Sequence, residues 1–222
     1  MRTGRTVAVL LSIAILLVSF GERGAKAQAF QAEVGGGWAV PSSSVDMAAD
    51  GQEGGVSIDP GSGSQVYAFL GLSWTVSENF ALEGGVRAQH SRLPGSTGDF
   101  GCETCTYSND PDGRLSGVTI EGKVTLISVG RINPYFLVGL GVMRTTVDGV
   151  LVTTPQDNQV QFSEVEVTDA GGDVGFGAQT HTVGGLQLTA EMRATGSLPG
   201  AKDNAVTAFP FTLGLKYTFG TE

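Results

Sequence analysis

The residues of this chain that are best able to do chemistry are charged side chains within otherwise apolar segments. They lie on the minority face of an alternating pattern. The charged set contains five acids and four bases, namely Glu33, Glu83, Arg87, Glu121, Lys123, Asp173, Glu191, Arg193 and Lys216. Isolated charges away from water are costly, so acids and bases in nearly equal numbers predict a paired, hydrogen-bonded network.

Two histidines and two cysteines are the other candidates for covalent chemistry. A serine nucleophile needs a neighbouring base, and His90 precedes Ser91, whereas His181 lies in a different segment. A histidine beside a serine occurs easily by chance, so we predict no catalytic residue. Cys102 and Cys105 form a Cys-x-x-Cys in a polar stretch with no helical pattern after it.

A local structural disulfide is therefore the favoured interpretation of Cys102 and Cys105. A zinc site would need further cysteines or histidines nearby, and the sequence around this motif has none. The sequence predicts no cofactor and no metal site.

The elements that must position the charges are eight segments with the period of a β-strand. The last one is the clearest, and its odd positions carry Phe209, Phe211, Leu213, Leu215, Tyr217 and Phe219. The predicted strands cover about residues 30–40, 64–76, 80–90, 114–128, 134–147, 169–180, 185–196 and 209–219. They are longer than the strands of soluble sheets, which have about 5–6 residues, and match tilted membrane strands.

Short and long connections alternate between these strands. The short ones are 77–79, 130–133 and 181–184, and the long ones are 41–63, 91–113, 148–168 and 197–205. This layout is typical of a bacterial outer-membrane barrel, with its turns in the periplasm and its loops outside. We therefore predict an all-β fold, an eight-stranded antiparallel up-and-down transmembrane β-barrel.

The two faces of the predicted strands differ in a way that orients the barrel. Large apolar residues cover one face, and the charges share the other with Gly35, Gly37, Gly71, Gly85, Gly139, Gly141, Gly175, Gly177 and Gly214. Small residues are needed where eight strands crowd a narrow lumen, so the charged face is predicted to point inward and the apolar face to meet lipid. A soluble ligand-carrying barrel would show the reverse. Aromatic residues at the strand ends fit interfacial girdles, although aromatic residues are also good strand formers: Phe30, Trp38, Trp74, Phe80, Tyr217 and Phe219.

The N-terminus carries a targeting pattern. Arg2 and Arg5 precede an apolar run from Val7 to Phe20, and Ala25-Lys26-Ala27 then supplies the small residues that a signal peptidase reads. The run is shorter than the roughly 20 residues of a membrane-spanning helix. We predict a cleavable signal peptide over residues 1–27 and a barrel domain over residues 28–222.

Composition agrees with this interpretation. Charged residues make up 16% of the chain, against about 25% in soluble domains, and the net charge is −9. Most of the acids outside the predicted strands lie in the long connections. An acidic chain of this kind is not expected to bind nucleic acid, because phosphate binding needs clustered Lys and Arg.

Over residues 28–222 the sequence resembles the small eight-stranded outer-membrane β-barrel family, which includes the OmpA-like and OmpX-like transmembrane domains. The resemblance rests on RINPYFLVGLGV (131–142), DVGFGA (173–178) and FTLGLKYTF (211–219). In that family the assembly machinery reads an alternating last strand with a C-terminal aromatic residue. The resemblance therefore implies that Tyr217 and Phe219 form the assembly signal, although the chain continues to Glu222.

The predicted function is that of a structural outer-membrane protein with acidic extracellular loops available for surface interaction. An eight-stranded barrel is only wide enough for its own side chains, which argues against a large pore. The alternative function is therefore a pore for small solutes or ions. A lipid A-modifying enzyme is less favoured. The expected partners are outer-membrane lipid, lipopolysaccharide and, during biogenesis, the barrel-assembly machinery, and the expected state is a monomer in the bacterial outer membrane.

Overall fold

The structure is a computed structural model that describes residues 26–49, 55–102, 104–127, 131–198 and 206–219. The predicted signal peptide lies almost wholly outside the described residues, so its cleavage stays a prediction. Among the described residues, no helix is long and apolar enough to cross a membrane.

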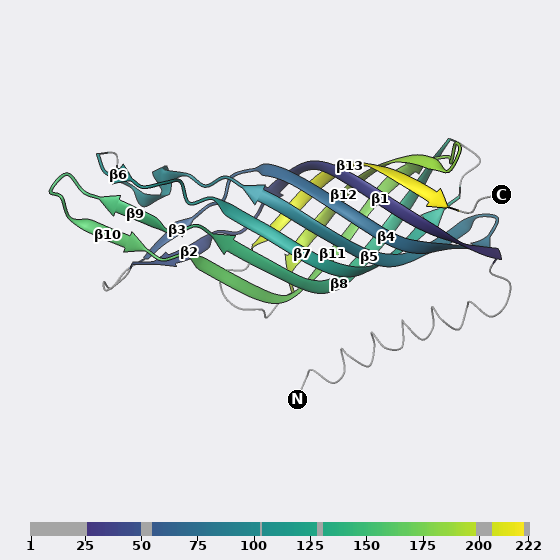
Figure 1. Cartoon of the computed structure of the whole chain (residues 1–222), viewed down its shortest axis with the longest axis horizontal. Coiled ribbons are helices and arrows are strands. Elements are labelled where there is room, and N and C mark those ends of the chain that lie inside the picture. The colour runs from purple at the N-terminus through teal and green to yellow at the C-terminus, as the bar shows by residue number, and fades with distance from the viewer. Residues whose placement is uncertain (1–25, 50–54, 103, 128–130, 199–205, 220–222) are drawn as a thin grey trace, which may run out of the picture.

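Eight long strands of the described chain close into an antiparallel barrel (Figure 1). They are β1 (Lys26–Pro41), β4 (Gly63–Ser77), β5 (Phe80–Leu93), β7 (Gly113–Leu126), β8 (Ile132–Val147), β11 (Val165–Thr180), β12 (Leu186–Ser197) and β13 (Thr207–Phe219). Each strand pairs with the next one in this order, and β13 pairs with β1 to close the barrel. The predicted eight-stranded up-and-down barrel is confirmed.

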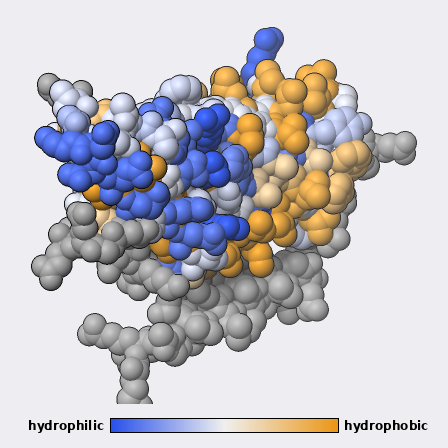
Figure 2. Space-filling model, turned by 60° about the vertical axis from the view of Figure 1, so that its left-hand side comes forward, coloured by the Kyte–Doolittle hydropathy of each residue, from blue (hydrophilic) through white to orange (hydrophobic). Residues whose placement is uncertain are grey.

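The alternation of the sequence sorts side chains between the two faces of the barrel wall. Outward positions carry large apolar side chains that are exposed, including Ile120 at 74%, Phe136 at 62% and Leu213 at 60%. Figure 2 shows hydrophobic surface gathered over one part of the wall and hydrophilic surface toward the end that carries the smaller sheets. A wall with this much exposed apolar surface is suited to lipid.

The long connections contain short strands of their own, which were not predicted from the sequence. In the first connection, β2 (Val45–Ala48) pairs with β3 (Gly55–Ile58). A second sheet has the order β10 (Gln159–Phe162), β9 (Val150–Thr153), β6 (Thr106–Tyr107), and a 3-10 helix, η2 (Thr97–Phe100), precedes β6. These strands have four residues or fewer, too short for an alternation to stand out in the sequence.

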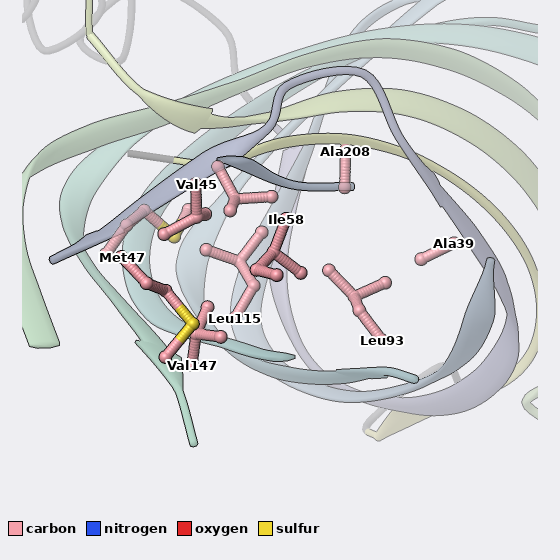
Figure 3. Close-up of a cluster of buried hydrophobic side chains, with 10 residues drawn as sticks. Ala39, Val45, Met47, Ile58, Leu93, Leu115, Val147 and Ala208 are labelled. Atoms are coloured by element: carbon pink, nitrogen blue, oxygen red, sulfur yellow. The ribbon is translucent and has the colours of Figure 1, made fainter. Parts of the chain in front are cut away.

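The small strands lie at one end of the barrel, opposite the end where β1 begins and β13 finishes (Figure 1). At that end the inner face becomes apolar. We call this buried cluster the apolar cap, and it consists of Ala39, Val45, Met47, Ile58, Leu93, Leu115, Met143, Val147, Val206 and Ala208. Figure 3 shows side chains from the barrel strands and from the β2–β3 hairpin converging in it. The rule that the inner face is polar therefore holds for the middle of the barrel and not for this end.

Three aromatic side chains fill the middle of the lumen, and glycines make room for them. A Cβ atom at Gly35 would lie 2.5 Å from Cε1 of Tyr67, and one at Gly177 would lie 2.5 Å from Cζ of Tyr135. A Cβ atom at Gly71 would lie 2.6 Å from Cζ of Phe69. The inward glycines thus keep open the volume that these rings occupy.

This packing predicts opposite tolerances at two glycines. Gly35→Ala forces a methyl group into the Tyr67 ring and into the neighbouring strand, so we expect the free energy of unfolding to fall by about 1–3 kcal/mol. The matched control is Gly122→Ala, whose new Cβ would meet nothing within 4 Å. It should change the free energy by less than about 0.5 kcal/mol. Urea unfolding in detergent micelles measures both, and equal effects would contradict the packing argument.

Candidate functional site

The candidate site is the middle of the lumen, where the structure places all nine charged residues singled out in the sequence. None of the nine is more than 4% exposed. Six strands supply them: Glu33 from β1, Glu83 and Arg87 from β5, Glu121 and Lys123 from β7, Asp173 from β11, Glu191 and Arg193 from β12, and Lys216 from β13.

Two lysines and two glutamates form one cluster. The Lys123 Nζ atom lies 3.5 Å from Glu33 Oε2 and 3.3 Å from Glu83 Oε2. Lys216 donates to Glu83 Oε1 at 2.9 Å and to Gln179 Oε1 at 2.5 Å. Lys216 stands directly opposite Glu33 in the β1–β13 register, yet its hydrogen bonds reach across the lumen to β5 and β11. The lysine cluster therefore ties together strands that are not neighbours.

Two arginines and two glutamates form the other cluster, with better geometry. Arg193 donates to both carboxylate oxygens of Glu121, at 2.6 and 3.2 Å. It also donates to both oxygens of Glu191, at 2.8 and 2.9 Å. Arg87 lies 2.8 Å from Glu191 Oε1. Such forked contacts between guanidinium and carboxylate are the strong form of this interaction.

Two tyrosines connect the clusters. Tyr67 donates to Glu33 at 2.7 Å, and the Arg87 guanidinium lies 3.6 Å from the centroid of its ring. Tyr135 donates to Glu191 at 3.1 Å, and Lys123 Nζ lies 4.4 Å from its ring centroid. Each tyrosine thus contacts an acid of one cluster and a base of the other. A cation over an aromatic face is attracted by the ring.

The fifth acid, Asp173, is held by neutral donors. Gln89 donates to its Oδ1 at 3.0 Å and Thr119 to its Oδ2 at 2.9 Å. Among the described residues no salt bridge involves Asp173, so the two clusters balance four acids against four bases.

The other residues singled out in the sequence lie outside this network. Cys102 and Cys105 form a disulfide in the connection between β5 and β7. His90 and Ser91 point to opposite faces of β5: Ser91 is buried, whereas His90 is exposed and its Nδ1 lies 2.8 Å from Ser116 Oγ. The pairing of His90 with Ser116 could not be seen in the sequence, because the two residues are on different strands.

The ends of the barrel hold the remaining features. Tyr217 and Phe219 lie at the end of β13, where Phe219 also contacts Phe30 with ring centroids 5.4 Å apart. At the opposite end, Arg92 donates to Asp112 at 2.6 Å. That hydrogen bond holds the pKa of the Asp112 carboxyl below its usual range. The described residues include no group of three or more His, Cys, Asp or Glu that could hold a metal ion.

A family model for the outer membrane protein beta-barrel domain matches residues 11–219, which is most of the sequence. The chain belongs to this family of outer-membrane β-barrel proteins. Membership indicates the bacterial outer membrane as its location.

Solved structures of other outer-membrane barrels are similar in fold. Neisserial surface protein A matches with a TM-score of 0.50 and 16% identity, over 89% of this chain and 100% of that one. A major outer membrane protein from Thermus thermophilus matches with a TM-score of 0.45 and 13% identity, over 87% and 100%. OprG from Pseudomonas aeruginosa matches with a TM-score of 0.44 and 16% identity, over 89% and 99%. A comparison with curated proteins gives no match.

The lumen of this outer-membrane barrel also contains aromatic side chains that were not predicted from the sequence. Tyr67 and Phe69 alternate with Val66, Ala68 and Leu70, so the period that oriented the charges also places both rings inside. The alternation of β4 therefore carries enough information to place these two rings on the inner face with the charges and glycines.

The arginine cluster yields a double-mutant prediction. Arg193→Met leaves Glu121 and Glu191 with one arginine between them, so we expect the free energy of unfolding to fall by about 3–5 kcal/mol. Adding Glu121→Gln removes the stranded charge and leaves the Arg87–Glu191 pair balanced. The double variant should therefore be more stable than Arg193→Met alone. Urea unfolding in micelles tests this, and a double variant less stable than the single one would contradict the charge balance.

Proposed function

We propose that this protein is a structural component of the outer membrane with a closed lumen and an ordered outer surface available for interactions. The observation that carries the proposal is that two different layers of side chains fill the lumen in series. The first is the charged and aromatic network, and the second is the apolar cap.

The network layer supports a closed lumen because its arginines and lysines are paired with its glutamates. Arg193 bonds two carboxylates through both sides of its guanidinium, and the lysines each contact acids on other strands. An ion passing through would have to separate these pairs in a region where separation is costly.

The apolar cap supports a closed lumen for a different reason. Val45, Ile58 and Val147 are fully buried, and Leu93 and Leu115 are 1% exposed. An apolar constriction gives a hydrated ion nothing to replace its water, so it blocks conduction independently of charge. Opening a path would require the β2–β3 hairpin and the strand ends around it to separate.

The outer surface above the cap is acidic. Exposed or partly exposed acids at this end include Asp110, Asp148, Asp157, Glu164 and Glu166, and the two small sheets order the connections that carry them. Ordered polar connections of this kind provide a surface for partners in the surrounding medium.

The remaining parts of the proposal concern biogenesis and assembly. We propose export through the signal peptide of residues 1–27, recognition of Tyr217 and Phe219 by the barrel-assembly machinery, and a monomer surrounded by outer-membrane lipid and lipopolysaccharide. We also propose that the protein is not an enzyme. Ser91 faces the lumen, away from His90. Among the described residues, no carboxylate hydrogen-bonds to His90 in the way that the acid of a catalytic triad orients its histidine.

Electrical recording tests the closed lumen. Refolded protein inserted into planar lipid bilayers should show little or no steady conductance, because both layers must open before ions can pass. Heat-modifiable migration of the same sample on a gel provides the control that the barrel is folded and embedded. A large, steady conductance from folded protein would contradict the proposal and favour the pore.

A further inference from the structure

Three arginines form a patch on the outer wall at the end of the barrel that carries the apolar cap. We call Arg92, Arg114 and Arg144 the arginine patch, and they lie on the adjoining strands β5, β7 and β8. Arg92 and Arg114 face each other in the β5–β7 register, and Arg144 faces Ser116 in the β7–β8 register. Their side chains are 68%, 47% and 56% exposed.

The depth of the patch is set by the strands that carry it. Below it, most outward positions of β7 and β8 hold exposed apolar side chains, and the last of these before the patch are Val118 and Val142. The next outward positions on the three strands are His90, Ser116 and Arg144, and Arg92 and Arg114 follow. The guanidinium groups therefore lie where the lipid-facing wall ends, at the level of lipid headgroups.

The patch occupies only one side of the barrel. On the other side, the outward positions near the same end are Val40 of β1, Phe209 of β13 and Leu198 just after β12, all exposed. Among the described residues, every other Lys or Arg lies in the lumen or at the opposite end. Among the described residues, exposed arginines at this end are therefore confined to β5, β7 and β8.

The arginines have acidic partners that an incoming anion can displace. Arg92 contacts Asp112 at 2.6 Å, Arg114 contacts Asp148 at 2.7 Å and Arg144 contacts Glu166 at 2.6 Å. The arginine side of each pair is open to solvent, and ion pairs at a solvent-exposed surface contribute little to stability. A phosphate group carries more charge than a carboxylate and matches the same forked geometry of the guanidinium.

We propose that the arginine patch binds the phosphate groups of a phosphorylated glycolipid of the outer leaflet, of the lipid A type. The acyl chains lie against the apolar wall of β7 and β8 below the patch, and His90 and Ser116 provide polar contacts between the arginines. This inference rests on the proposed function, which places the capped end of the barrel outside the cell.

Lipid retention measured by native mass spectrometry tests the site. The refolded full-length protein is released from micelles that contain either bisphosphorylated lipid A or the same lipid without phosphates. Wild-type protein should retain the phosphorylated lipid at least tenfold more strongly. Arg92→Gln, Arg114→Gln and Arg144→Gln together should abolish that preference. The matched control is Arg131→Gln, an exposed arginine beyond the opposite end of the strands, and it should leave the preference unchanged.

A second variant should increase the retention of phosphorylated lipid A, whereas the triple variant should lower it. Glu166→Gln removes the carboxylate that pairs with Arg144 and should strengthen retention of phosphorylated lipid A, because the guanidinium no longer has to leave a partner. Equal retention of the two lipids by wild-type protein, or a preference that survives in the triple variant, would overturn the proposal. So would complete displacement of the lipid by millimolar inorganic phosphate, since the wall below the patch would then contribute nothing.

Failure of this inference can be told apart from failure of the proposed function. If the patch does not bind phosphorylated lipid, the protein still migrates as a heat-modifiable barrel and still shows no conductance. If the barrel is not a closed outer-membrane protein, those two properties fail in the wild type before any arginine is changed.

Discussion

Charges buried inside a narrow wall of strands are the constraint on which this structure depends. The lumen holds acids and bases that are almost completely shielded from water, and an unpaired charge there would be strongly destabilising. The structure meets the constraint with two balanced clusters and with one acid, Asp173, held by neutral donors. Because four of the ion pairs join strands that are not neighbours, the same contacts that neutralise the charges also fix those strands relative to one another.

The aromatic rings and the glycines follow from this arrangement. All eight barrel strands contribute to the network, since β4 supplies Tyr67 and β8 supplies Tyr135 in addition to the six strands that carry charges. A ring can reach the middle of the lumen only where the neighbouring inward positions have no side chain, and glycines occupy those positions. Each of the three rings inside the barrel thus lies against an inward glycine, which explains why glycine shares the inner face with the network.

The sequence predicted the fold and the orientation of the charges because a strand has a period of two and the wall separates lipid from lumen. It could not predict which acid meets which base. Lys216 is opposite Glu33 on the neighbouring strand but bonds Glu83 across the lumen, and that choice depends on how the closed barrel staggers its strands. The apolar cap could not be predicted either, because Val45, Met47 and Ile58 lie in strands of the first long connection that are too short to show a clear alternation. The partnership of His90 with Ser116 likewise needs the register of β5 and β7.

The two ends of the barrel differ for a physical reason. The end with short turns closes around polar residues such as Gln179 and Thr218, whereas the other end carries long connections that must be anchored to the wall. Polar side chains would leave these connections hydrated and loosely held, but apolar ones on the inner face give Val45, Met47 and Ile58 a surface to pack on. The cap therefore both closes the lumen and orders the outer surface. It also fixes the ends of β5, β7 and β8, and those ends hold Arg92, Arg114 and Arg144 close together on the outside of the wall.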